Sequence, residues 1–196
     1  MKHRIHGKAA IALGLLSVAL GASAQGTAAS ASSTASAPAA KSADAKGAAL
    51  AGADKAFVQK AAIGGMAEVE MGNLAQQKAA SEQVKQFGAR MVTDHTKAND
   101  ELKQVASSKG IDLPASLDKK HQADLDRFGK MTGAQFDKAY MSHMVDDHKK
   151  DVSEFQKEAK SGKDADVKGF ASKTLPTLQE HLQLAQSTHA AVKKEK

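Results

Sequence analysis

The sequence predicts an all-α protein built as a bundle of four long helices. Apolar residues recur with the helical period of about 3.6 residues from Asp54 to Val192. The 196 residues include no Trp and one Tyr, so the core must consist of Ala, Met and other aliphatic side chains, which suit close packing of helix on helix. Cysteine is also absent, which excludes disulfides, thiolate catalysis and cysteine-based metal sites.

Two segments precede the helical pattern. Residues 1–24 are typical of a secretory signal peptide, with a basic start, a short apolar stretch and the small-residue cleavage site Ala22-Ser23-Ala24. Residues 25–53 consist almost entirely of Ala, Ser, Gly and Thr, and they offer no large apolar side chain to bury. We therefore expect a flexible linker there and export of the domain at 54–192 to the periplasm or the extracellular space.

The distribution of charge along the chain argues against nucleic acid as a partner. Removal of the signal peptide lowers the formal charge from +6 to +3, and the basic tail 193–196 carries two of these charges. Charges of both signs alternate along each expected helix without forming a basic face, so nucleic-acid binding is not expected. Stable membrane insertion after cleavage of the signal peptide is not expected either.

Capping residues and glycines set the expected helix boundaries. Asp54 is expected to cap the first helix, and Thr132 with Gln135 has the spacing of a capping box. Pro176 lies inside the last helix and should kink it or remove one backbone hydrogen bond. The four long helices are expected over 54–79, 82–109, 133–160 and 164–192.

The connections between these helices differ in length. Two are tight turns, whereas the connection at 110–132 is long and contains a short helix around 116–128. Two helical hairpins joined by one long crossover form the ferritin-like plan, whereas a simple up-down bundle has three short loops. A weak internal repeat agrees with two related hairpins: Val84-Lys85-Gln86-Phe87 resembles Val167-Lys168-Gly169-Phe170, and Phe57 precedes Glu68 by 11 residues as Phe136 precedes Asp147.

The apolar face of each long helix carries one titratable residue near its middle. These four residues are Glu68, His95, His148 and His181. Counting from the turns at about 1.5 Å per residue, the heights of Glu68 and His95 differ by roughly 4 Å, and His181 lies about one turn off the level of His148. The spacing therefore predicts one central polar layer.

A carboxylate and several imidazoles that converge inside a bundle would suit one transition-metal ion, either iron, manganese, zinc or copper. Residues around this set could support the ligands or supplement them, namely Asp94, Tyr140, His143, Asp147 and Glu180. His121 and His189 have no such neighbours and are expected at the surface. Two alternatives stay open, which are a purely structural polar layer and a small-molecule pocket.

Three motifs in the helical region resemble a known bacterial family. They are Phe87-Gly88-x-x-Met91-Val92-x-Asp94-His95, Gly133-x-x-Phe136-Asp137-x-x-Tyr140-x-x-x-Met144-Val145-x-x-His148, and Phe170-Ala171-x-x-x-Leu175-Pro176-x-Leu178-x-x-His181-Leu182-x-x-Ala185. Across 57–189 the chain is similar to the family called domain of unknown function 4142, whose members are often labelled outer membrane proteins. The resemblance implies a ferritin-like fold and export, and it implies no settled activity.

The chain departs from the ligand pattern of di-iron ferritins. Those proteins use Glu-x-x-His motifs, whereas here Asp94-His95 and Glu180-His181 are adjacent pairs whose side chains point about 100° apart. Ferroxidase chemistry is therefore not expected. The sequence instead favours an exported binding or stress-related module that holds a single metal ion. The alternatives are a structural bundle that binds a protein partner or a second copy of itself, and a metal-dependent oxidase.

Overall fold

The computed structural model describes residues 50 and 52–194, and it contains five helices over this part of the chain. They are α1 (Gly52–Lys78), α2 (Glu82–Ser108), α3 (Lys119–Gly129), α4 (Gly133–Ser161) and α5 (Ala165–Val192). The all-α prediction is confirmed, and each long helix begins and ends within two residues of its expected bounds. The signal peptide expected at 1–24 and nearly all of the linker expected at 25–53 lie outside the described residues.

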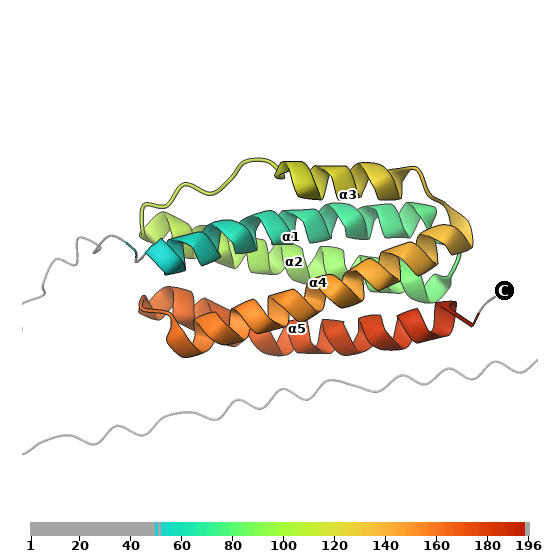
Figure 1. Cartoon of the computed structure of the whole chain (residues 1–196). Coiled ribbons are helices and arrows are strands. Elements are labelled where there is room, and N and C mark those ends of the chain that lie inside the picture. The colour runs from blue at the N-terminus through green and yellow to red at the C-terminus, as the bar shows by residue number, and fades with distance from the viewer. Residues whose placement is uncertain (1–49, 51, 195–196) are drawn as a thin grey trace, which may run out of the picture. The chain divides into compact units, whose positions relative to one another are not determined.

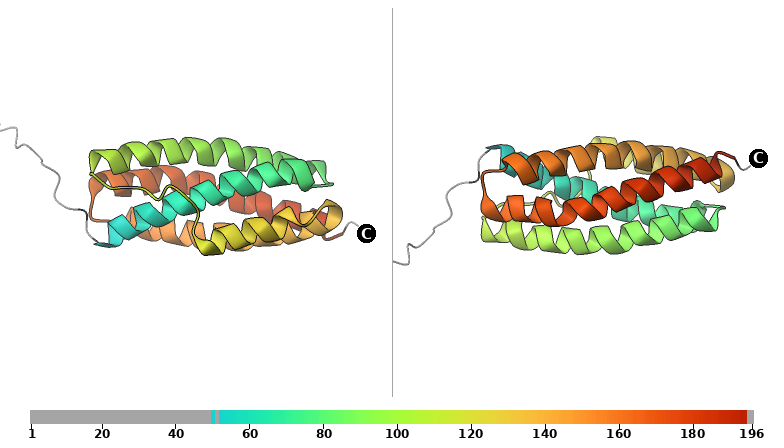
Figure 2. Two further views of the ribbon diagram at one scale, coloured as in Figure 1. Left: turned by 90° about the horizontal axis from the view of Figure 1, so that it is seen from above. Right: turned by 90° about the horizontal axis from the view of Figure 1, so that it is seen from below.

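The four long helices form two antiparallel hairpins that lie side by side (Figures 1 and 2). Helices α1 and α2 form the first hairpin, α4 and α5 form the second, and contacts of α1 with α4 and of α2 with α5 join them. The long connection after α2 returns along the bundle, so that α3 lies against α1 (Figure 1). This is the predicted arrangement of two hairpins with one long crossover. None of the described helices is long and apolar enough to cross a membrane.

Each hairpin holds the turn of the other through one buried aspartate. Both carboxylate oxygens of Asp137 in α4 accept backbone N–H groups of the α1–α2 turn, from Ala80 at 3.2 Å and Ser81 at 2.9 Å. One oxygen of Asp54 in α1 accepts from Lys163 at 2.9 Å and Asp164 at 2.7 Å in the α4–α5 turn. The expectation that Asp54 caps its own helix is therefore wrong, because α1 begins at Gly52 and this carboxylate serves the other hairpin.

These contacts define the register of the internal repeat. Asp54 and Asp137 are 83 residues apart, as are Val84 and Val167 of the repeated Val-Lys-x-Phe motif. This register pairs Glu68 with Asp151, one helical turn beyond the pairing with Asp147 that the 11-residue spacing suggested. The two hairpins are thus related, and the carboxylates of Glu68 and Asp151 hold equivalent positions in them.

The helix starts differ in their caps. Asp118 accepts the N–H of His121 at the start of α3, and Asp164 accepts the N–H groups of Asp166 and Val167 at the start of α5. Thr132 is the N-cap residue of α4 but its side chain makes no cap hydrogen bond, so the expected capping box does not form. Pro176 lies within an uninterrupted α5, because packing against the other helices holds the helix together across the lost N–H.

The apolar core is divided into two clusters. One lies toward the α1–α2 turn and includes Met71, Phe87 and Tyr140. The other lies toward the α4–α5 turn and includes Val58 and Phe170. In α2, α4 and α5, the residue predicted for the polar layer falls between the part of the helix that contributes to one cluster and the part that contributes to the other, and in α1 Glu68 lies next to this boundary, directly after Ala67. The fold thus presents a buried polar layer at mid-height.

Two glycines allow α1 and α2 to approach each other closely. A Cβ on Gly88 would lie 2.7 Å from the Cβ of Ala75 and 2.7 Å from the carbonyl oxygen of Gly72, neither of which can rotate away. A Cβ on Gly64 of α1, by contrast, would meet nothing within 4 Å, so no close helix contact requires a glycine at this position.

We predict opposite effects of alanine at these two glycines. Gly88→Ala should lower the free energy of unfolding by about 1–3 kcal/mol, because two helix backbones must separate. Gly64→Ala should raise it by up to about 1 kcal/mol, since alanine favours the helix and nothing obstructs the methyl group. Urea unfolding followed by circular dichroism measures both, and equal effects would contradict the close approach at Gly88.

Candidate metal centre

The polar layer contains all four residues that the sequence placed in it. Glu68 of α1, His95 of α2, His148 of α4 and His181 of α5 are each at most 7% exposed. Each comes from a different helix, so the layer spans the whole cross-section of the bundle. Burial of four titratable groups at one height is costly unless they have partners, which makes their mutual geometry informative.

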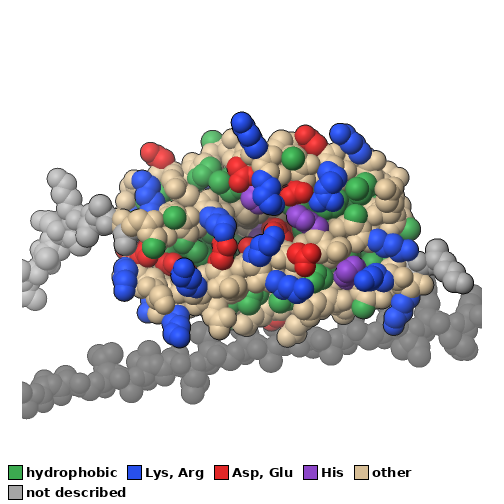
Figure 3. Space-filling view, viewed as in Figure 1, with side chains coloured by type: hydrophobic (Ala, Val, Ile, Leu, Met, Phe, Trp, Pro, Cys, Tyr) green, Lys and Arg blue, Asp and Glu red, His purple; other side chains and the backbone are tan. Residues whose placement is uncertain are grey.

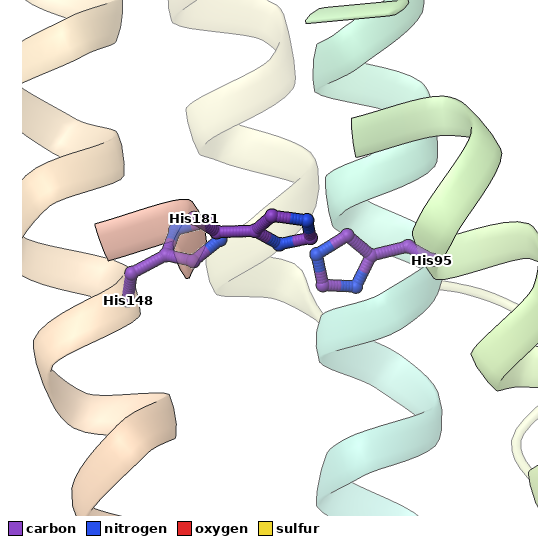
Figure 4. A group of neighbouring side chains, drawn as sticks. All are labelled: His95, His148 and His181. Carbon is purple, nitrogen blue, oxygen red and sulfur yellow. The ribbon is translucent and has the colours of Figure 1, made fainter. Parts of the chain in front are cut away.

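The three imidazoles form a compact group. The ring centroids of His95 and His148 are 5.9 Å apart, and the ring of His181 is 5.4 Å from each of them. One nitrogen from each ring can be chosen so that all three lie within 4.8 Å of one another. Figure 4 shows the rings converging from three helices. His181 therefore belongs to the group, and the one-turn offset expected for it does not separate it from His148.

Each ring has one nitrogen without a hydrogen-bond partner among the described residues. These buried atoms are Nε2 of His95, Nε2 of His148 and Nδ1 of His181. The other nitrogens of two rings are engaged: Nδ1 of His148 lies 3.0 Å from the carbonyl oxygen of Met144, and Nε2 of His181 lies 2.8 Å from Oδ2 of Asp94. Metal-binding histidines commonly donate their second N–H to a carbonyl or carboxylate in this way, which fixes the ring orientation.

Asp94 is itself held by a chain of surface contacts. Its Oδ2 accepts from Nε of Arg90 at 3.2 Å, and Arg90 donates through Nη2 to Glu180 at 2.7 Å. Although partial burial opposes ionisation, hydrogen bonds from His181 and Arg90 lower the pKa of Asp94. Of the acids expected beside the histidines, Asp94 thus contacts the group directly, whereas Glu180 is exposed and contacts Arg90.

The three histidines are neutral at pH 7. Burial and the neighbouring imidazoles hold the pKa of His95 well below its usual value, and burial with the proximity of His181 lowers the pKa of His148 to about 4. Burial also lowers the pKa of His181, although Asp94 opposes this shift. Neutral imidazole is the form that binds a metal ion, so the trio needs no deprotonation to do so.

Glu68 lies to one side of the histidine group. Its Oε1 is 3.8 Å from Nδ1 of His148, the ring nitrogen that already lies near the carbonyl oxygen of Met144. The unpartnered nitrogen of His148 is the other one, Nε2. Its carboxylate instead groups with those of Asp147 and Asp151. Burial and the charges of these two aspartates raise the pKa of Glu68 well above its usual value. The structure thus separates the predicted four-residue set into a histidine trio and a carboxylate trio.

The remaining expected neighbours have other surroundings. Tyr140 is fully buried, and its ring stacks on Phe136 with centroids 5.3 Å apart. His143 packs against Phe128 of α3, 5.1 Å between centroids, and is not part of the trio. His121 and His189 also lie outside it, and both are partly buried rather than exposed.

Sequence reasoning missed two residues of the layer's surroundings. Asp151 joins Glu68 and Asp147, and Arg90 orients Asp94. The i, i+4 spacing of Asp147 and Asp151 on α4, and of Arg90 and Asp94 on α2, was the available signal for both.

Comparisons with known proteins agree with the fold. Two solved structures superpose on most of the chain. The first is a DUF305 fragment from Deinococcus radiodurans, with a TM-score of 0.65 and 9% identity, covering 74% of this chain and 99% of that one. The second is the "putative secreted protein DUF305" from Streptomyces coelicolor, with a TM-score of 0.62 and 14% identity, covering 71% of this chain and 92% of that one. At these identities the likeness concerns the fold alone, and no curated protein matches the chain.

The sequence itself matches one family model, described as "Domain of unknown function (DUF4142)", over residues 38–188. The match includes all four residues of the polar layer and the motifs around them. The chain therefore belongs to the DUF4142 family.

Proposed function

We propose that this protein is an exported metal-binding module that holds one transition-metal ion between His95, His148 and His181. The observation that supports this proposal best is the set of three buried, unpartnered imidazole nitrogens, one from each of three helices. A structural histidine normally uses its buried polar atoms in hydrogen bonds, whereas here each of the three neighbouring rings keeps one buried nitrogen without such a bond among the described residues.

The spacing of the rings suits an ion after a small adjustment. Three nitrogens at about 2.0–2.1 Å from one tetrahedral ion lie about 3.3 Å from one another. One nitrogen from each ring lies within 4.8 Å of the other two, so side-chain rotations that move each nitrogen by about 1 Å would bring all three to the distance that one ion requires. Hydrogen bonds to Met144 and Asp94 keep two of the rings oriented for this contraction.

The ligand set favours zinc or copper among the candidates. Imidazole nitrogen binds both ions well, whereas manganese prefers carboxylate oxygens and non-haem iron commonly takes a carboxylate beside two histidines. Three protein ligands also leave a fourth position for water or a small ligand, as in zinc sites with three histidines. A cavity of about 320 Å³ is lined in part by His95, and another of about 120 Å³ is lined in part by His95 and His181.

Metal titration of the purified protein tests the proposal. Isothermal titration calorimetry should detect one equivalent of Zn²⁺ or Cu²⁺ bound to the metal-stripped chain. Because each imidazole supplies one of three ligands, His95→Ala and His181→Ala should each weaken binding more than about 100-fold. His189→Ala serves as the matched control, since this histidine lies on α5 outside the trio, and it should bind as the wild type does.

The opposite outcome would favour the alternative function. If the wild-type protein binds neither ion, or if His189→Ala weakens binding as much as His95→Ala, the three histidines form a structural layer and the bundle is an interaction or scaffold protein. Export rests on the signal-like residues 1–24, and the mass of the protein recovered from the periplasm or the medium should show their removal.

A further inference from the structure

Next to the histidine trio lies a second group of potential ligands that the proposed metal centre does not use. It consists of the carboxylates of Glu68, Asp147 and Asp151, from which one oxygen each lies within 4.8 Å of the other two. Asp147 and Asp151 are one turn apart on α4, and Glu68 faces them from α1. In the register of the internal repeat, Glu68 and Asp151 are equivalent positions, so each of the two related hairpins places an acid there, and the second hairpin adds Asp147.

Glu68 provides an observation independent of the clustering itself. Its side chain is 1% exposed, and neither carboxylate oxygen has a hydrogen-bond partner among the described residues. The nearest cationic candidate, Nδ1 of His148, is 3.8 Å away and already lies 3.0 Å from a carbonyl oxygen. A buried carboxylate with two unused oxygens, pointed at two further carboxylates, is strongly disfavoured unless a cation or a proton lies between them.

The carboxylate trio can be reached from the surface. Asp147 and Asp151 line the cavity of about 320 Å³ that also reaches His95. Lys60 and Lys150 stand at this cavity, where Lys60 pairs with Glu154 and Nζ of Lys150 is 3.8 Å from Asp147. Both lysines are largely exposed, so they can turn away from the aspartates without loss of packing. Figure 3 shows acidic and histidine side chains together near the middle of this face, with lysines and arginines around them.

The chemistry of the three ligands selects the kind of ion. Carboxylate oxygens are hard ligands, which Ca²⁺, Mg²⁺ and Mn²⁺ prefer and which zinc and copper share with imidazole. Three oxygens that surround one Ca²⁺ ion at about 2.3–2.6 Å lie up to about 4.5 Å from one another, and Ca²⁺ accepts irregular geometry. Mg²⁺ at about 2.0–2.1 Å demands a near-ideal octahedron and gives up its water reluctantly. The three oxygens lie at most 4.8 Å apart, so small side-chain movements are enough to bring them onto a Ca²⁺ ion.

We propose that Glu68, Asp147 and Asp151 form a second cation site, selective for a hard divalent ion of calcium's size, directly beside the histidine trio. This site goes beyond the proposed function, because it uses different ligands and a different class of ion. The two sites share the backbone of α4, where Asp147 and His148 are consecutive, so the protein would carry one nitrogen-liganded and one oxygen-liganded ion at mid-height in the bundle.

Calcium binding to the purified, metal-stripped protein tests this site. Calorimetric titration with Ca²⁺ alone at physiological ionic strength should show one equivalent bound. Asp151→Asn keeps the size of the side chain and removes one anionic ligand, so it should weaken Ca²⁺ binding at least about tenfold. Glu68→Gln is the second variant, and it should have the same effect from the buried side. Asp146→Asn is the matched control: Asp146 is an exposed neighbour on α4 that lies outside the trio, and its loss should leave binding unchanged.

The two metal sites can be tested separately in one set of variants. His95→Ala should abolish tight zinc or copper binding yet retain one equivalent of Ca²⁺. Asp151→Asn should weaken Ca²⁺ binding and leave tight binding of zinc or copper unchanged. Absence of Ca²⁺ binding to the wild-type protein at millimolar concentration would overturn the second site whether or not zinc binds, as would equal losses in Asp151→Asn and Asp146→Asn.

Discussion

Saturation with Zn²⁺ is expected to raise the free energy of unfolding of this protein by about 4 kcal/mol when free zinc is roughly 1,000 times the dissociation constant. An ion that binds the folded chain and not the unfolded chain stabilises the folded state by mass action. The ligands come from α2, α4 and α5, which lie far apart in an unfolded chain, so the assembled site exists only in the bundle. The unfolding temperature should rise by roughly 10 °C.

Urea unfolding followed by circular dichroism, with and without zinc, measures this stabilisation. The expected difference should disappear in His95→Ala and persist in His189→Ala, whose histidine lies outside the trio. A comparable zinc-dependent increase in His95→Ala would mean that the ion binds elsewhere, for example at the carboxylate trio. Copper should give the same ranking of variants if the histidine trio is the site.

The architecture was largely predictable because the apolar period is long and uninterrupted. Four stretches with a 3.6-residue period, two tight turns and one long connection allow few arrangements, and the observed helices begin and end close to the expected residues. Capping details were less predictable, because Asp54 has the sequence context of a cap and is used instead to hold the α4–α5 turn. A tertiary contact of this kind leaves no local signal in the sequence.

The level of the candidate site along the bundle was predictable, but its separation into a histidine trio and a carboxylate trio was not. Counting residues from each turn placed Glu68, His95, His148 and His181 in one layer, and all four lie there. Which side of a neighbouring ring a residue faces depends on the rotation of each helix about its axis, and counting along the axis does not contain this rotation. Glu68 therefore belongs with Asp147 and Asp151, on the far side of His148 from its unpartnered nitrogen.

The cost of losing His148 is expected to depend strongly on pH in the metal-free protein. Burial and the proximity of His181 lower the pKa of His148 to about 4 in the folded chain, against about 6.5 in an unfolded one. As pH falls below 6.5, this histidine becomes protonated in the unfolded chain but stays neutral in the folded chain down to about pH 4, so acidification favours unfolding. This histidine alone should lower stability by about 2 kcal/mol at pH 5 and about 3 kcal/mol at pH 4, relative to pH 7.

The carboxylates act in the opposite direction, so the wild type alone does not isolate this effect. Burial and the charge of Asp147 raise the pKa of Asp151 to about 7, which means that its protonation on acidification stabilises the folded chain. Asp151 is present in both the wild type and His148→Gln, so its effect cancels in the difference between their free energies of unfolding. The destabilisation caused by His148→Gln, measured by urea unfolding at pH 7, 5 and 4 in the presence of a chelator, should shrink by about 3 kcal/mol across the series. A difference between the two proteins that stays constant with pH would show that His148 titrates normally and is not held neutral in the bundle.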